Sequence, residues 1–203
     1  MRFGVAASAA AVLVLAGAAK AEQTVGQPAG NFRATDANGR QVSLSDYKGK
    51  TVVLEWNNPG CPFVQKHYNS GNMQKTQAAA KAMGAVWLTI NSGAPGKQGH
   101  MTGPEANAFV AKVRAAPTAY VLDPQGRVGK GYAAKTTPQM FVIDGKGVLR
   151  YQGGIDDKPT ANPADIATAR NHVTAALGEM KAGKAVSVTE TRPYGCSVKY
   201  ADS

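Results

Sequence analysis

The 203-residue sequence contains few cysteines and histidines: two cysteines, Cys61 and Cys196, and three histidines. A chain of this length buries a core without needing disulfides, so the two cysteines are free to serve chemistry. Three histidines with no recognised ligand spacing argue against a dedicated metal protein, and no metal or other cofactor is expected.

Long runs of like charge are also missing, although lysine and arginine outnumber aspartate and glutamate and give a formal net charge of +10. The basic residues are scattered one at a time, whereas a basic arm that binds nucleic acid usually carries five or six together. The charge pattern therefore predicts no nucleic-acid partner.

Long hydrophobic runs are absent except near the start, where residues 4–17 are apolar after Arg2. This run is too short for a permanent membrane span, and Ala19-Lys20-Ala21 fits a small-x-small cleavage site. We expect residues 1–21 to be a cleaved signal peptide of an exported protein, with the bacterial periplasm as the expected location. No stable membrane insertion is expected, and residues 22–183 are predicted to form one domain followed by a tail over 184–203.

Cys61 lies where a predicted strand gives way to a predicted helix. The β-branched segment Thr51–Trp56 is typical of a strand buried on both faces, Asn57–Gly60 is turn chemistry, and Pro62 suits the first turn of a helix. Cys61 would then meet the free N–H groups of a helix N-terminus, which favour the thiolate and make the sulfur a nucleophile.

Predicted strands alternate with predicted helices along most of the chain, which indicates an α/β fold with a central mixed sheet flanked by helices. The turn at 36–39 predicts an N-terminal hairpin, and the periodicity of 165–182 predicts one long helix. A polar, extended tail carries Cys196. Cys61 is expected at the carboxyl end of a central strand, which is where ligands of open α/β sheets bind.

Several stretches of the chain resemble thioredoxin-fold redoxins, and more specifically the peroxiredoxin-like proteins of the alkyl hydroperoxide reductase/thiol-specific antioxidant superfamily. The resemblance covers about residues 27–182 and the tail, and it implies a thioredoxin-like fold and thiol-based oxidoreductase activity in antioxidant defence or redox homeostasis. Four stretches carry it: Val52–Val64, Thr136–Asp144, Tyr151–Asp157 and Gly195–Tyr200.

Three positions depart from the family patterns. Thioredoxins carry a second cysteine where this chain has Val64; peroxiredoxins carry threonine at the position of Asn58 and arginine at that of Pro138. Thr137-Pro138 instead resembles the thioredoxin cis-proline, which lies beside the active sulfur and presents backbone to a disulfide. Thiol–disulfide exchange is therefore as well indicated as peroxide reduction.

The residues favour a redox enzyme in which Cys61 attacks a peroxide, or a protein or small-molecule disulfide, Cys196 resolves the intermediate, and an external thiol reductant resets the pair. The resemblance adds Pro138 beside the sulfur. Asn58, Pro62 and Thr137 are predicted to bind substrate.

Glu55 is the one acidic residue in an otherwise apolar strand. It is a candidate proton relay, because a desolvated carboxyl group has a raised pKa. The alternative is a glutamate that points outward or is held by hydrogen bonds. Lys66 or His67 could lower the pKa of the Cys61 thiol, but His67 would lie nearly opposite Cys61 on the helix, so for His67 we expect a surface role.

Two alternatives to the enzyme remain at this stage. Cys61, His67 and either Met101 or Met140 could bind a soft metal such as copper. A permanent disulfide between Cys61 and Cys196 would instead be a structural element in a non-catalytic protein.

Overall fold

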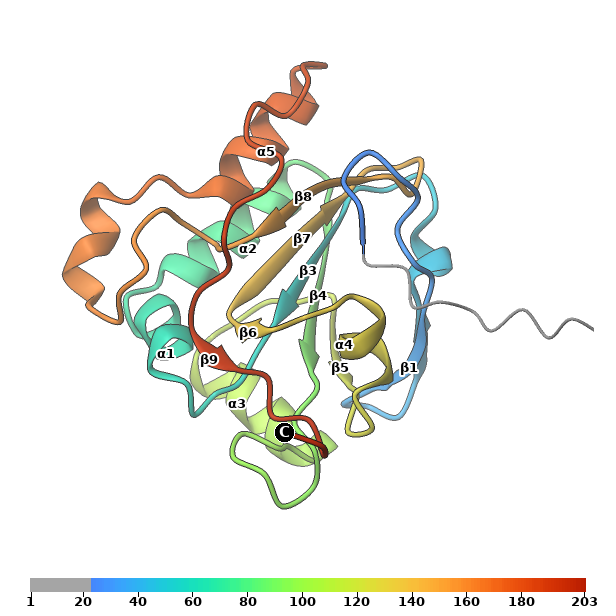
Figure 1. The fold of residues 1–203 in the computed structure, drawn as a ribbon, viewed down its shortest axis with the longest axis vertical. Helices are drawn as coiled ribbons and strands as arrows, with labels where there is room; N and C mark the ends of the chain where they lie inside the picture. The colour runs from blue at the N-terminus through green and yellow to red at the C-terminus, as the bar shows by residue number, and fades with distance from the viewer. Residues whose placement is uncertain (1–22) are drawn as a thin grey trace, which may run out of the picture.

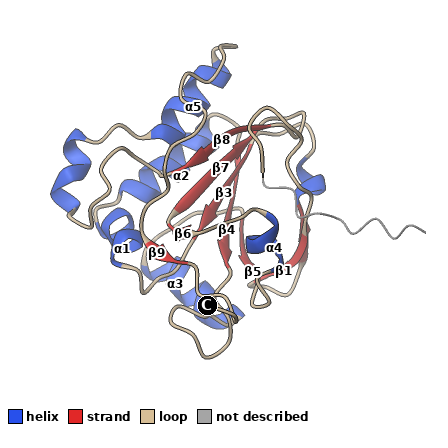
Figure 2. Cartoon of the chain, in the orientation of Figure 1, coloured by secondary structure: helices blue, strands red, loops and turns tan. Residues whose placement is uncertain are grey.

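A computed structural model describes residues 23–203 as a central sheet with helices on both faces (Figures 1 and 2). The predicted signal peptide lies outside the described residues. Within them, seven strands form one mixed sheet in the order β2-β1-β5-β4-β3-β7-β8. These strands are β1 (Arg33–Asp36), β2 (Gln41–Ser43), β3 (Val52–Trp56), β4 (Val86–Asn91), β5 (Ala119–Leu122), β7 (Gln139–Ile143) and β8 (Leu149–Gly153).

The middle of the sheet is parallel and its edges are antiparallel. Strands β3, β4 and β5 run parallel, while β7 pairs antiparallel with both β3 and β8. The predicted N-terminal hairpin forms as β1 and β2, and β1 pairs antiparallel with β5. The predicted mixed α/β sheet of a thioredoxin-like fold is therefore confirmed.

Helices cover both faces of the sheet. Two helices follow Cys61 and are separated at Ser70 and Gly71. The helices on that face pack on a core that includes Cys61. The opposite core contains Trp56 and Tyr132. The elements are α1 (Pro62–Asn69), α2 (Asn72–Ala82), α3 (Gly103–Lys112), α4 (Arg127–Gly131) and α5 (His172–Lys181), with short 3-10 turns η1 (Leu44–Tyr47) and η2 (Pro163–Thr168).

Strand β3 is buried on both faces, as its composition predicts. Side chains alternate along a strand, so Leu54 and Trp56 enter the core on the α4 side, while Val53 enters the core on the α1 side. Glu55 shares the face of Val53 and contacts Tyr68 on α1. The strand therefore delivers the chain to Cys61 at its carboxyl end.

The single helix predicted over 165–182 is wrong. The chain instead makes η2, an extended residue at Ala169, and then α5. Asn171 ends the extended segment because its side chain accepts a hydrogen bond from the Thr174 backbone N–H at 3.0 Å, which starts a new helix. Apolar periodicity continued across this break and hid it.

The C-terminal tail packs along the domain instead of extending away from it. In Figure 1 it runs from the end of α5 down across the sheet to β9 (Cys196–Ser197), which pairs with β6 (Thr136–Thr137). Val198 is buried in the core on the α4 side, and the Tyr200 hydroxyl donates to the Ala134 carbonyl at 2.8 Å. Buried apolar contacts therefore hold the C-terminal tail against the domain, although its sequence is mostly polar.

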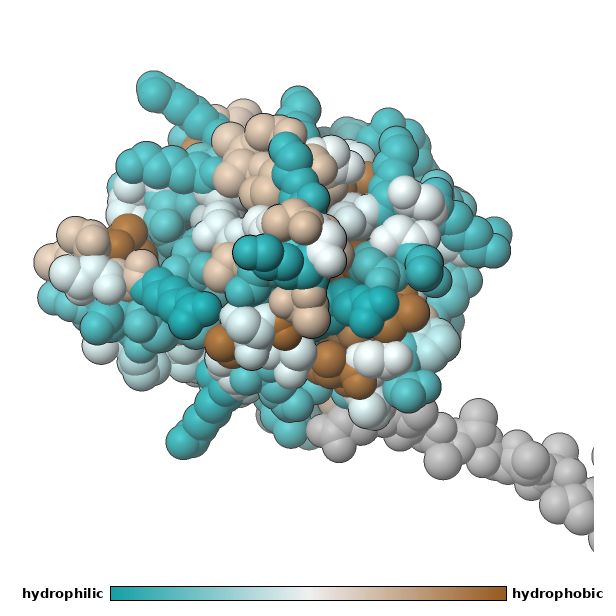
Figure 3. Space-filling view, turned by 90° about the horizontal axis from the view of Figure 1, so that it is seen from above, coloured by the Kyte–Doolittle hydropathy of each residue, from teal (hydrophilic) through white to brown (hydrophobic). Residues whose placement is uncertain are grey.

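The face of the molecule seen in Figure 3 is mostly hydrophilic, with hydrophobic residues in small patches. Over residues 23–203, no helix has both the length and the apolar character needed to cross a membrane. A cavity of about 830 Å³ lies near the start of β3, lined by Thr51, Met180 and their neighbours, at the opposite end of that strand from Cys61.

Candidate functional site

Cys61 lies immediately before α1, where the turn after β3 ends. Its backbone is extended and Pro62 is the first helical residue, so the sulfur faces the free N–H groups of the first turn, as predicted. The side chain is fully buried. Its thiol can donate to the Thr137 carbonyl oxygen, 3.1 Å from the sulfur. The Thr137–Pro138 peptide bond is cis, as the resemblance implied.

Cys196 reaches the same place from the far end of the chain. In the β6–β9 ladder it is the direct partner of Thr137, whose carbonyl contacts Cys61, and the two thiols lie within hydrogen-bond reach of each other. Both are free thiols in this structure. The tail therefore supplies the partner that is missing at Val64.

The surroundings make the two thiols unequal. Burial raises the pKa of the Cys61 thiol, but hydrogen bonds from the Cys196 thiol and the Val64 backbone N–H outweigh burial and leave the pKa below its ordinary value. Burial and the neighbouring Cys61 sulfur raise the pKa of Cys196 to about 11. Of the two thiols, Cys61 therefore loses its proton first as the pH rises, which makes it the better nucleophile and leaving group.

The two sulfurs also differ in access. Cys61 has no exposed surface, whereas Cys196 is partly exposed. Strand β9 passes in front of the sheet beside β6 in Figure 1, so the tail covers the approach to Cys61. A substrate or partner larger than a small molecule would therefore contact the Cys196 sulfur before the Cys61 sulfur.

Glycine before Cys196 is required by this close approach. Gly195 has φ of +132°, and a Cβ atom built there would lie 1.9 Å from the Thr137 carbonyl oxygen. No other residue type fits without moving β9 away from Thr137.

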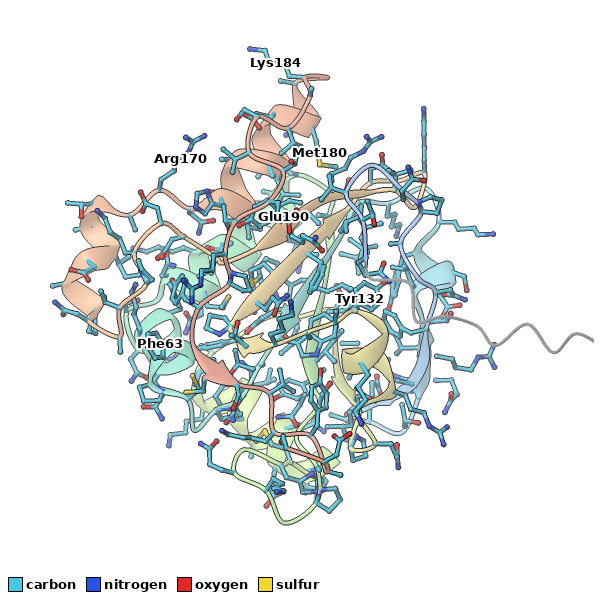
Figure 4. The ribbon with its side chains drawn as sticks, viewed as in Figure 1. Phe63, Tyr132, Arg170, Met180, Lys184 and Glu190 are labelled. Atoms are coloured by element: carbon cyan, nitrogen blue, oxygen red, sulfur yellow. The ribbon has the colours of Figure 1, made fainter. Side chains whose placement is uncertain are left out.

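A buried polar cluster fixes the tail upstream of Cys196. The Tyr194 hydroxyl donates to the Asp156 carboxylate and lies 3.1 Å from His67 Nε2. The Tyr194 ring packs edge-on against Phe63 of α1, with the ring centroids 5.9 Å apart; Phe63 is labelled in Figure 4. We call Lys66, His67, Asp156 and Tyr194 the tail latch. These residues hold the chain that leads into Cys196.

The expected surface role of His67 is wrong, and Lys66 beside it is buried as well. Lys66 Nζ donates to the Lys158 carbonyl at 2.7 Å and lies 3.6 Å from Asp156, and both side chains are buried. The helix turns them toward Asp156, which lies about 90 positions further along the chain, so neighbouring sequence contained no signal of the pairing. Burial lowers the pKa of His67 to about 4, which makes it neutral at pH 7.

Glu55 is fully buried and held by four donors, which fits the hydrogen-bonded alternative for this residue. Tyr68 and Trp87 each donate to it at 2.8 Å, and Asn57 and Thr89 each donate at 3.0 Å. Burial raises the pKa of Glu55 in spite of these hydrogen bonds. Its partners belong to β4, to α1 and to the turn that follows β3.

Asn58 and Pro62 lie beside Cys61 in different environments. Asn58 is buried and holds the neighbouring loops, because its amide nitrogen donates to Gln98 at 2.8 Å and its oxygen accepts from the Gly60 backbone at 2.9 Å. Pro62 is exposed. Thr137 contributes its carbonyl to Cys61, and its buried hydroxyl has no hydrogen-bond partner.

The structure does not support the copper-site alternative. Among residues 23–203, no group of three or more His, Cys, Asp or Glu side chains is placed to bind a metal. His67 already contacts Asn72 through Nδ1 at 2.8 Å and Tyr194 through Nε2. Its imidazole has no nitrogen left for copper.

A cysteine at a helix start, a cis-proline beside it and a mixed sheet beneath define the thioredoxin-like class of redox protein. The family comparison agrees: residues 25–152 match the model of the AhpC/TSA family, and the chain belongs to that family. The family and the redoxin fold support a thiol oxidoreductase role in general.

Three solved structures show how far this similarity extends. A hypothetical protein from Sinorhizobium meliloti is 24% identical with a TM-score of 0.74, over 90% of this chain and 98% of its own. A putative thiol:disulfide interchange protein DsbE from Chlorobium tepidum is 27% identical with a TM-score of 0.53, over 64% and 85%. A secreted disulfide oxidoreductase from Mycobacterium tuberculosis is 20% identical with a TM-score of 0.52, over 71% and 95%.

Proposed function

We propose that this protein is an exported thiol–disulfide oxidoreductase whose redox centre is the Cys61–Cys196 pair. The observation that carries the proposal is the β6–β9 ladder, which brings Cys196 from the tail to the sulfur of Cys61. Export is supported by the apolar leader-like start of the sequence and by its small-residue cleavage pattern.

With a disulfide substrate, the Cys61 thiolate attacks one substrate sulfur and the substrate S–S bond breaks, releasing the first thiolate. Cys196 loses its proton and attacks the Cys61 sulfur, which releases the second thiolate and leaves a Cys61–Cys196 disulfide. The substrate gains two electrons and the protein loses two. Thr137 and Pro138 lie beside the sulfur that reacts.

Peroxide reduction is the second candidate, and the burial of Cys61 favours it. A small peroxide can reach a covered sulfur more readily than a protein disulfide can. Attack by Cys61 breaks the O–O bond, releases an alcohol or water and leaves a sulfenic acid, and Cys196 then displaces water to form the same disulfide.

Rapid mixing of the reduced protein with hydrogen peroxide, and separately with 2-hydroxyethyl disulfide, tests both candidates. We expect both thiols to disappear together, faster than free cysteine reacts, with the loss of two hydrogens seen by mass spectrometry. Cys61→Ser should abolish the reaction, and Cys196→Ser should stop it at a Cys61 sulfenic acid or mixed disulfide. Wild-type rates no faster than free cysteine with both oxidants would contradict the proposal.

A thioredoxin-type dithiol provides the second half of the test. This dithiol should reduce the Cys61–Cys196 disulfide back to two thiols on the time scale of the rapid-mixing assay. A disulfide that stays closed in that reductant supports the structural role instead of the redox role.

A further inference from the structure

A polar pocket of about 500 Å³ lies against the tail directly before Cys196. Its walls include Thr136, Asp156, Asp157 and His172 from the domain and the tail segment Arg192–Gly195. A volume of this size is within the range of small-molecule sites. Thr136 and Gly195 are the chain neighbours of Thr137 and Cys196, so two wall residues of the pocket adjoin the redox centre in the chain.

Buried polar atoms without hydrogen-bond partners concentrate in this pocket. Among the described residues five such side-chain atoms occur, and three of them belong to its walls: Thr136 Oγ1, Asp156 Oδ2 and His172 Nδ1. Such atoms normally have partners, because burying a polar group without a hydrogen bond is unfavourable. Because the three residues all line this one pocket, a ligand with complementary polar groups would supply the missing partners.

The polar atoms in the pocket walls are mainly hydrogen-bond acceptors, so a complementary ligand carries hydrogen-bond donors. Asp156 is 4% exposed, and its Oδ2 lies 3.6 Å from the Lys66 ammonium and 3.9 Å from His67 Nε2, too far for a hydrogen bond to either. His172 is 9% exposed, and burial lowers its pKa, so the neutral imidazole has one nitrogen that accepts. Asp157 adds a carboxylate that is open to solvent. A carboxylate acceptor, an imidazole acceptor and a hydroxyl are complementary to a group that carries several N–H donors.

We propose that this pocket binds the protonated amine of the thiol that exchanges with Cys196. The inference rests on the proposed redox function and names the chemical class of its reductant: a thiol with an ammonium or guanidinium group a short distance from sulfur. Either a small aminothiol or a cysteine flanked by a basic side chain in a polypeptide has this chemistry.

The chemical step follows from the properties of the two sulfurs. An outside thiolate attacks the partly exposed Cys196 sulfur of the oxidised pair, the Cys61–Cys196 bond breaks, and Cys61 leaves as the more stable thiolate. A second outside thiol attacks the mixed disulfide, forms the outside disulfide and returns Cys196, which takes up a proton. Two outside thiols lose two electrons and the protein disulfide gains them. The amine in the pocket holds the first thiol in line with Cys196.

Three thiols with the same ethylene spacer test the proposal: cysteamine, 2-mercaptoethanol and 3-mercaptopropionate. The measured quantity is the rate at which each thiol reduces the oxidised pair, expressed per thiolate to remove differences in ionised fraction. The less basic thiolate is intrinsically the weaker nucleophile, which works against cysteamine and makes a cysteamine preference more telling. We expect cysteamine to react about tenfold faster than 2-mercaptoethanol, the size expected of one charge-assisted hydrogen bond. The excess of positive charge on the protein would favour the anionic thiol, so a cationic preference is diagnostic of a local site.

The variant Asp157→Asn should remove most of the cysteamine advantage, as should His172→Phe, which retains a ring beside Tyr151. Asp46→Asn is the matched control, because it removes the same charge on η1, away from the pocket. Both test variants spare the contact between Asp156 and Tyr194, so the tail latch is kept.

Equal rates for the three thiols overturn the proposal, and so does a preference that Asp157→Asn and Asp46→Asn reduce equally. A preference for 3-mercaptopropionate overturns it as well and assigns recognition to Arg192. If 2-mercaptoethanol cannot reduce the pair, or no pair forms on oxidation, the proposed function itself has failed. Cysteine peptides with an adjacent lysine, glutamine or glutamate distinguish the sources: a lysine preference as large as that of cysteamine supports a polypeptide reductant, and its absence supports a small aminothiol.

Discussion

At the scale of single residues, the reactivity of Cys61 comes from the groups that donate to its sulfur. The Val64 backbone N–H is a consequence of the strand-to-helix turn, and the same donor would exist in any chain with this local sequence. The Cys196 thiol is a donor only because the tail returns to this place.

Removing the Cys196 donor should raise the pKa of Cys61. We expect the pKa to rise in Cys196→Ala, because the Cys61 thiolate loses a hydrogen-bond donor that favours the charged form. The measurement is the midpoint of the pH profile of Cys61 alkylation, which is independent of the plateau rate that reports access. Cys196→Ser keeps a donor and should restore much of the lower value; an unchanged midpoint in Cys196→Ala would contradict the assignment.

His67 should make the protein less stable in mild acid. Burial lowers its pKa to about 4 in the folded protein, while the unfolded chain binds a proton near the ordinary value of about 6.5. The unfolded state therefore holds more protons between these values, and stability is lost as the pH falls from about 6.5 to about 4, by roughly 3 kcal/mol in total. Urea unfolding of wild type and His67→Asn at a series of pH values isolates this contribution, since the other titrating groups are shared. Parallel curves for the two proteins would argue against it.

At the scale of elements, the β6–β9 ladder determines whether the two cysteines meet. Gly195 permits the ladder because any side chain there would collide with the Thr137 carbonyl. The tail latch and the buried Val198 hold the strand on both sides of Cys196.

Gly195→Ala should slow the formation of the Cys61–Cys196 disulfide by tenfold or more, because the new methyl group forces β9 away from β6; tenfold corresponds to about 1.4 kcal/mol. Disulfide formation after peroxide addition is the measurement. Gly178→Ala is the matched control, since Gly178 lies within α5 and a Cβ there meets nothing within 4 Å. Equal rates in the two variants would show that the ladder is not required.

At the scale of the whole molecule, the pair joins a central strand to the C-terminal tail. A bond between Cys61 and Cys196 would close a loop of about 135 residues, and the chain-entropy model gives loops of that size about 4–5 kcal/mol of stabilisation. The midpoint of urea unfolding should therefore rise when the pair is oxidised. Cys61→Ser should show no such rise under the same oxidant, and a wild-type midpoint that falls on oxidation would indicate a strained bond.

The sequence by itself determined the elements that local patterns encode: the buried β3, the turn and proline that place Cys61 at a helix start, and the N-terminal hairpin. Residues 165–182 show the limit of periodicity, because an apolar repeat continued through the break at Ala169. Thr137-Pro138 was found through resemblance, since nothing in its composition distinguishes a cis bond.

Only the tertiary structure decided which distant residues meet. The tail latch joins α1 to Asp156 and Tyr194, the pocket gathers Asp156, His172 and the tail, and Cys196 lies opposite Thr137. No local signal records these contacts, because each residue type is ordinary in its own neighbourhood. Their partners are selected by how the helices and the tail pack on the sheet, and that packing depends on burial over the whole chain.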